Sequence, residues 1–131
     1  MLRWIKFIGF LLVGLAIFSL FPASVDYAEK FIQKFEDKSW AGTAYYQLGN
    51  HCYRTLRYGK ALEIYEKALR KYPRHPLSSL AMFRVAVCLE KLDRNREAIR
   101  AYKRFLRKNP HHYLAPQARN ELKRLEELEG K

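Results

Sequence analysis

Apolar residues recur three and four positions apart along most of the chain after residue 23, the spacing that places them on one face of an α-helix. Turn signals such as Pro73, Asp93 and Pro110 interrupt this pattern. It predicts helices over residues 24–38, 43–55, 60–71, 77–92, 96–108 and 114–129. No stretch alternates apolar and polar residues as a half-buried strand would. The sequence therefore predicts an all-α fold.

Two of these helices carry the same kinds of residue at the same intervals. The first copy consists of Ala61, Tyr65, Ala68 and Pro73, and the second of Ala98, Tyr102, Phe105 and Pro110. The offset between the copies is 37 residues throughout, and a fixed period of this size is typical of stacked helical repeats. Ala28, Ile32 and Phe35 repeat part of the interval, which indicates half a repeat before the first full one.

The period divides the chain after residue 23 into four parts. They are a half-repeat helix over 24–41, a first repeat over 42–75, a second repeat over 76–112 and a capping helix over 113–131. The last helix has an apolar stripe and a charged opposite face, as the exposed end of a repeat stack requires. Gly49 lies in the middle of a predicted helix, where it costs about 1 kcal/mol relative to Ala. We therefore expect a close helix crossing at Gly49 that a Cβ atom would obstruct.

The first 23 residues have a different pattern. Residues 7–21 form an uncharged apolar run that follows Arg3 and Lys6. A helix rises about 1.5 Å per residue, so residues 5–23 would just span a hydrocarbon core of about 30 Å. We predict an uncleaved transmembrane helix over 1–23, in contact with the bilayer through residues 5–23. A cleaved secretory signal is the alternative, but the residues before Ala23 and Ser24 fit a cleavage site poorly.

The repeat residues resemble the tetratricopeptide repeat family over about residues 25–128. The matching positions are Leu48, Gly49, Tyr58, Ala61, Tyr65, Ala68 and Pro73, followed by Ala98, Tyr102, Phe105 and Pro110. Tyr45 stands where the family usually has Trp, Ala86 where it has Gly and Asn95 where it has Tyr. The resemblance implies a short solenoid of helical hairpins, about two repeats with flanking helices, that binds other proteins.

The offset, together with the opening of the last helix at residues 112–118, is similar to bacterial cell-envelope repeat proteins. These include outer-membrane assembly lipoproteins and Tol–Pal-associated periplasmic proteins. This chain departs from them because it lacks a lipoprotein Cys and is shorter. The resemblance implies a single-pass protein of a bacterial inner (plasma) membrane. With basic residues before the apolar run, the positive-inside rule predicts a periplasmic domain, and a cytoplasmic domain attracted to anionic lipid is the alternative.

In the family, the first helix of each hairpin lines a concave groove. The resemblance implies groove residues Thr43, Tyr46, Asn50, Tyr53 and Arg54 in the first repeat, and Phe83, Arg84, Val87 and Lys91 in the second. Asn50 matches an Asn with which some members clamp a peptide carboxylate, but Tyr46 replaces the Lys of that clamp. We therefore expect an aromatic and basic groove suited to an extended or helical peptide.

The charge balance favours anionic partners. The chain has 25 Lys and Arg against 13 Asp and Glu, a formal net charge of +12. A basic surface is predicted on one side of the helix over 96–108, formed by Arg96, Arg100, Lys103, Arg104 and Arg107. A solvated outer face is the simplest interpretation, and docking to anionic lipid or an acidic protein is the alternative. The predicted membrane tether disfavours nucleic acid.

The sequence offers no catalytic motif, metal site or cofactor site. Cys52 and Cys88 lack metal-ligand spacing and fall on different helices, where free buried thiols are expected. The sequence thus predicts a membrane-anchored, non-enzymatic interaction module that scaffolds or assembles a membrane or envelope complex, with subunits of that complex as partners. Two alternatives are a permanent accessory subunit of a membrane enzyme complex and a cleaved periplasmic adaptor.

Overall fold

Helices make up the secondary structure of the residues that the structure describes, which are 3–6, 8–9, 11–13 and 21–130. The computed structural model divides the chain into two units, Met1–Glu36 and Asp37–Lys131. Its helices are α2 (Pro22–Lys34), α3 (Ala41–Arg54), α4 (Tyr58–Lys71), α5 (Ser78–Lys91), α6 (Asn95–Lys108) and α7 (Ala115–Glu129). The prediction of an all-α fold is confirmed over these residues.

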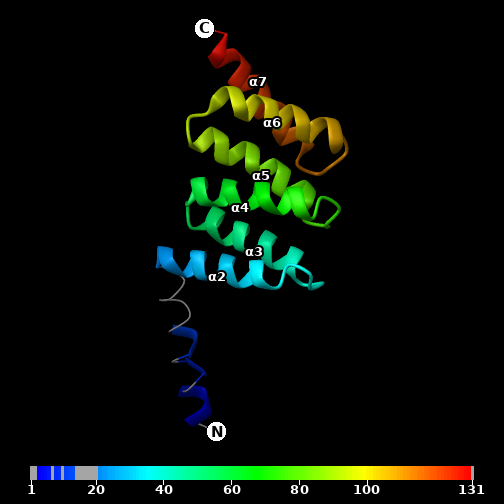
Figure 1. The fold of residues 1–131 in the computed structure, drawn as a ribbon. Helices are drawn as coiled ribbons and strands as arrows, with labels where there is room; N and C mark the ends of the chain where they lie inside the picture. Colours follow the sequence, from blue (N-terminus) through cyan, green and yellow to red (C-terminus); the bar gives the residue numbers. More distant parts are fainter. Residues whose placement is uncertain (1–2, 7, 10, 14–20, 131) are drawn as a thin grey trace. The chain divides into compact units, whose positions relative to one another are not determined.

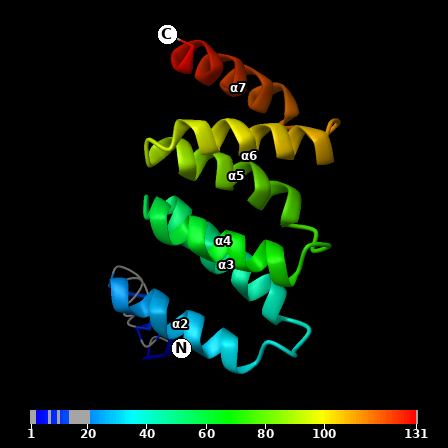
Figure 2. The ribbon, with the colours of Figure 1, turned by 45° about the horizontal axis from the view of Figure 1, so that its top comes forward.

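In the second unit the helices α3 to α7 stack in chain order (Figures 1 and 2). Each helix packs on the next, so that α3 with α4 and α5 with α6 form two hairpins and α7 covers α6. Helix α3 also contacts α5, the first helix of the following hairpin. This arrangement is the predicted solenoid of helical hairpins.

The repeated residues build the core of this unit. Small residues allow neighbouring helices to approach closely, and the aromatic residues fill the space between them. The repeat positions without exposed surface are Ala61, Tyr65, Ala68, Ala98, Tyr102 and Phe105. Leu48 and Tyr58 are half-buried, while Pro73 and Pro110 are exposed and follow the ends of α4 and α6. Gly49 is buried against Tyr65, as the expected close crossing requires.

The 37-residue offset extends to the loops. Leu56 and Asp93 both have the left-handed backbone conformation, with φ of 61° and 57°. The residue after each of them donates its N–H to a carbonyl of the preceding helix, in each case at 2.9 Å. The loops after α4 and α6 also match, because His75 Nδ1 accepts the N–H of Leu77 and His112 Nδ1 accepts that of Leu114.

In the first unit, α2 begins at Pro22, two residues before the predicted start. Proline suits the first turn of a helix because its fixed φ is helical and its missing N–H has no partner there. Ser24 lies inside this turn and donates its hydroxyl to the Phe21 carbonyl at 2.6 Å. Val25 and Ile32 are buried. They lie two helical turns apart, so they belong to one apolar stripe of α2.

The prediction of a transmembrane helix over 1–23 is wrong for the part of the chain that the structure describes. A span needs about 20 consecutive apolar residues in one helix. No helix among the described residues is long and apolar enough, and α2 has only 13 residues, among them Asp26 and Glu29. Residues 1–2, 7, 10 and 14–20 of the predicted span lie outside the described residues. The predicted bilayer contact and inner-membrane localisation depended on this helix and are corrected with it.

Candidate functional site

The first helices of the two hairpins present polar and basic side chains that share one face. On α3, Thr43, Gln47, Asn50 and Arg54 stand four, three and four positions apart and are exposed or half-buried. On α5, half-buried Arg84 and Val87 are followed by exposed Lys91. We call these seven residues, together with Tyr53, the α3/α5 face. It brings together most of the groove residues that the sequence predicted.

The centre of this face is the side chain of Arg84. Its Nη1 donates to Asn50 Oδ1 at 2.5 Å and lies 3.3 Å from Tyr65 Oη. Tyr65 in turn donates its hydroxyl to the same Asn50 oxygen at 2.7 Å. The guanidinium also lies over the ring of Tyr53, 4.8 Å from its centroid. These contacts with α3 and α4 fix the position of the cation that α5 carries.

Arg84 carries a positive charge that no carboxylate neutralises within the described part of the chain. Its contacts are an amide oxygen, a phenol and an aromatic ring. A guanidinium has five N–H donors, so most of them remain for a ligand. Burial raises the pKa of Tyr65 to about 12, and Arg84 only partly opposes this shift. Tyr65 therefore stays neutral at physiological pH and acts as a hydrogen-bond donor.

Two of the predicted groove residues lie in the core. Tyr46 is fully buried, donates its hydroxyl to the Tyr72 carbonyl at 2.9 Å and stacks on His75 with centroids 4.8 Å apart. Burial raises its pKa to about 12. Phe83 packs edge-on against Tyr102 and Phe105. Tyr46 and Phe83 therefore pack beneath the α3/α5 face, because the way the helices cross turns these two positions toward the core.

The other predicted residues lie at the surface. Thr43 is hydrogen-bonded to His75 Nε2 at 3.0 Å, across the loop that follows α4. Gln47 was not among the predicted residues, although it lies between Thr43 and Asn50 on the same stripe and accepts from Asn50 Nδ2 at 3.3 Å. The four-residue spacing from Thr43 was the signal that could have identified it.

Helix α6 carries the predicted basic surface, but its residues point to two sides. Arg96 and Lys103 pair with Glu129 and Glu126 of α7, at 3.3 Å and 2.6 Å. Arg100 and Arg104 instead line a groove on the side of α4, and Arg107 is exposed. The basic residues therefore form two flanks of one helix, and α7 covers one of them.

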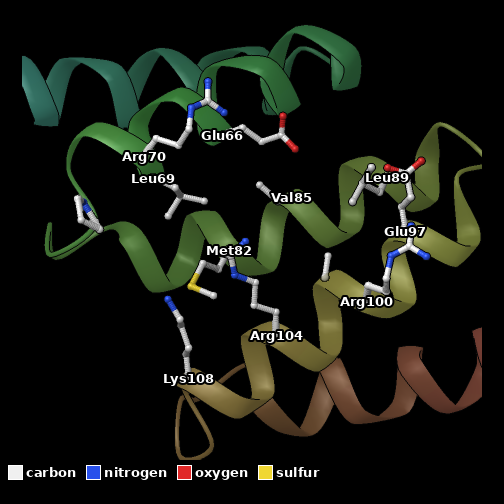
Figure 3. Close-up of a pocket in the computed structure, with 12 residues that line it drawn as sticks. Glu66, Leu69, Arg70, Met82, Val85, Leu89, Glu97, Arg100, Arg104 and Lys108 are labelled. Atoms are coloured by element: carbon white, nitrogen blue, oxygen red, sulfur yellow. The ribbon is translucent and has the colours of Figure 1, made fainter.

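The groove on the second flank runs between α4 and α6 and has a volume of about 510 Å³ (Figure 3). Helix α5 forms its floor. We call it the α4/α6 groove, and it is lined by Glu66, Leu69, Arg70, Pro73, Met82, Val85, Leu89, Glu97, Arg100, Ala101, Arg104 and Lys108. The sequence did not predict it, because the apolar residues of α5 that form its floor could not be distinguished from core positions.

Reactive or metal-binding groups are few in the described residues. Cys52 and Cys88 are buried. Burial raises the pKa of the Cys88 thiol to about 12, which keeps it protonated and unreactive. No group of three or more His, Cys, Asp or Glu side chains in these parts of the chain is placed to hold a metal ion.

Comparison with protein families gives a match. The family described as tetratricopeptide repeat matches residues 34–108, which include both hairpins. No curated protein matches the chain. The narrower likeness to bacterial envelope proteins therefore stays a prediction.

Proposed function

Because the chain belongs to the tetratricopeptide repeat family, whose repeats are protein–protein interaction modules, we propose that it holds a peptide segment of a partner protein on the α3/α5 face. Arg84 is the charged anchor of this interaction. The observation that supports the proposal is the fixed, partly exposed guanidinium that lacks a carboxylate partner among the described residues.

The placement of Arg84 favours binding of a carboxylate. Its position is already restrained by Asn50, Tyr65 and Tyr53, so a ligand would order little additional side chain on binding. Hydrogen bonds between a guanidinium and a carboxylate are short, often bidentate and about twice as strong as neutral ones. An Asp, a Glu or a C-terminal carboxylate of a peptide fits this requirement.

The surroundings of Arg84 indicate the rest of the ligand. Arg54 and Lys91 are exposed on the same face and add positive charge. Tyr53 and Val87 are half-buried and offer apolar surface. The preferred ligand is therefore an acidic peptide with an apolar side chain near its carboxylate.

Asn50 plays a different role from the Asn of the family's carboxylate clamp. Its Oδ1 already accepts hydrogen bonds from Arg84 and Tyr65, and its Nδ2 donates to Gln47. In this chain the amide positions the cation, and the cation binds the ligand. The change from Lys to Tyr46 agrees with this, because Tyr46 is buried and cannot supply a charge.

The test is binding of fluorescent peptides to the full chain and to three variants. Acidic peptides with one apolar residue beside the carboxylate are compared with amidated or Glu→Gln peptides. Removal of a charge-assisted hydrogen bond costs about 1.5–3 kcal/mol, so Arg84→Ala should weaken binding at least tenfold. Arg84→Lys should recover part of it, and Arg107→Ala should have no effect. Equal binding by wild type and Arg84→Ala would overturn the proposal.

The cellular role that follows is scaffolding or assembly of a protein complex. A small face with one charged anchor supports exchangeable, moderate-affinity partners better than a permanent interface, which is usually larger and more apolar. Quantitative copurification of wild type against Arg84→Ala tests this role. Several substoichiometric partners that depend on Arg84 support it, whereas one stoichiometric partner indicates a permanent accessory subunit instead.

A further inference from the structure

We propose that the α4/α6 groove is a second docking site and that it takes an acidic amphipathic helix of a partner protein. The groove is separate from the α3/α5 face, because Met82, Val85 and Leu89 of α5 line the groove while Arg84, Val87 and Lys91 of α5 belong to the face. One chain could therefore hold two different segments at once.

The floor of the groove is apolar and recessed. Met82, Val85 and Leu89 stand three and four positions apart on α5, and Leu69 of α4 joins them. Met82, Val85 and Leu69 are only half-buried, so part of this apolar surface is open to solvent. Helices α4 and α6 rise on either side as walls (Figure 3). A helix with an apolar stripe can enter between two such walls, whereas the flat surface of a lipid bilayer cannot reach the floor.

The charges of the groove are separated along its length. Glu97 lies beside Leu89 at one end, whereas Lys108 lies near Met82 at the other (Figure 3). Arg94 holds Glu97 with two hydrogen bonds, of 2.8 Å and 2.6 Å, which neutralises that wall at the Leu89 end. The basic character of the groove therefore increases from Leu89 toward Met82.

The basic residues of the two flanks of α6 differ in their partners. Arg96 and Lys103 are paired with glutamates of α7. On the groove side, Arg70, Arg104 and Lys108 make no ion pair with any residue that the structure describes. These three cations outnumber Glu66, the carboxylate of α4 that also lines the groove, so the apolar floor with its basic border favours a ligand with apolar and acidic groups.

Helix α7 shows what kind of segment α6 accepts. It packs on α6 with Leu125 buried, and Glu126 and Glu129 pair with the basic side chains of that flank. The groove flank offers the same chemistry, which is apolar surface bordered by Arg and Lys. We infer that its occupant has the same pattern as α7, with leucines along one stripe and glutamates beside them.

The test uses an 18-residue fluorescein-labelled helical peptide with Leu at three-and-four spacing and Glu on both flanks. The control peptide has Lys in place of every Glu. Binding to the full chain is measured by fluorescence polarisation at low and high salt. The variants are the pair Arg104→Glu/Lys108→Glu in the groove, Arg107→Glu outside it on the same helix, and Arg84→Ala on the α3/α5 face. Circular dichroism verifies that each variant is folded.

The expected result is binding of the acidic peptide alone, with an affinity that falls as salt rises. Each surface ion pair contributes up to about 1 kcal/mol, so reversal of two charges should weaken binding about tenfold or more. Arg107→Glu should bind as wild type does, and Arg84→Ala should keep the component of binding that Arg104→Glu/Lys108→Glu removes. An equal loss in Arg107→Glu would overturn the proposal, because it would show attraction by net charge alone.

Substitutions in the floor of the α4/α6 groove distinguish docking in the groove from electrostatic attraction to the protein. Val85→Arg adds a positive charge but fills the groove, so occupancy of the groove predicts weaker binding and electrostatic attraction alone predicts stronger binding. Met82→Ala, which removes apolar contact without adding charge, should weaken binding in the same direction. The last measurement tests whether vesicles of anionic lipid bind to the full chain. If they bind and the peptide does not, the proposal is overturned in favour of a lipid surface.

Discussion

A Cβ atom on Gly49 would lie 2.7 Å from Cδ1 and Cε1 of Tyr65. Heavy atoms do not approach each other so closely, and Tyr65 is fully buried and hydrogen-bonded to Asn50. The ring therefore has little freedom to move away. This contact explains why α3 tolerates a glycine in its middle, since the residue permits the close crossing of α3 and α4.

Gly49→Ala should destabilise the protein despite its better helix propensity. Overpacking costs about 1–3 kcal/mol, and the gain in propensity returns up to about 1 kcal/mol, so we expect a net loss of about 1–2 kcal/mol. Urea unfolding monitored by circular dichroism measures it. Gly59→Ala is the matched control, because a Cβ there meets nothing within 4 Å. If Gly49→Ala were as stable as Gly59→Ala, the close crossing would be wrong.

Asn50 and Tyr65 should be strongly coupled in stability. Asn50→Ala leaves the buried Tyr65 hydroxyl without its acceptor and should cost about 1–3 kcal/mol. Tyr65→Phe removes the hydroxyl and should cost about 1 kcal/mol. Once the hydroxyl is gone, loss of Asn50 matters less, so the double variant should be more stable than the sum of the single losses by about 0.5 kcal/mol or more. Strict additivity in the unfolding free energies would contradict the hydrogen bond.

The stability of the protein should fall as the pH rises above about 9. The Cys88 thiol has a pKa raised from 9.0 to about 12, chiefly by burial. Above pH 9 the unfolded chain loses this proton before the folded chain does, so the free energy of unfolding decreases as the pH approaches about 12. Below pH 9 both states keep the proton, and the contribution is fully present.

Cys88→Ala removes this source of pH dependence. Just above pH 9, before tyrosines titrate, the variant should lose less stability per pH unit than wild type, even though it is less stable overall because of the cavity that remains. Chemical unfolding at a series of pH values measures both slopes. Parallel curves for wild type and variant would show that Cys88 does not titrate as its burial implies.

Leu56→Asn should stabilise the protein. Leu56 has φ of 61° and is 70% exposed, so its side chain contributes little packing to offset the strain. The left-handed conformation costs an ordinary residue about 1–2 kcal/mol, and Asn adopts it more readily. We expect a gain of about 0.5–1 kcal/mol, seen as a higher Tm. Leu92→Asn is the control and should give no gain, because Leu92 also follows a helix but has an ordinary φ of −94°.

The N-terminal segment shows the limit of predicting a membrane span from hydropathy alone. Residues 7–21 have the composition of a membrane span, but composition does not establish one continuous apolar helix. Helix α2 begins at Pro22 and contains the charged Asp26 and Glu29. The pattern indicates the cost of placing each residue in lipid, whereas a span also requires one long apolar helix, which the described residues do not contain.

The sequence by itself determined the repeats. Ala61 and Tyr65, and their counterparts Ala98 and Tyr102, are close in sequence, and helical periodicity alone directs them to one face. This information is local, so the order of the helices and the core of the solenoid could be predicted. The turns could be predicted as well, since Pro73 and Pro110 disfavour a helical conformation of the residues that precede them.

Only the tertiary structure decided which groups meet across helices. Tyr65 and Arg84 lie 15 and 34 positions from Asn50, and no spacing rule links their side chains. The crossing of α3, α4 and α5 also decides that Tyr46 is buried and Arg84 is not. Likewise, the packing of α7 on α6 divides a basic helix into a paired flank and an open groove. Sequence period fixes the face of one helix, but the angle and distance between helices depend on the volumes of all the side chains packed between them.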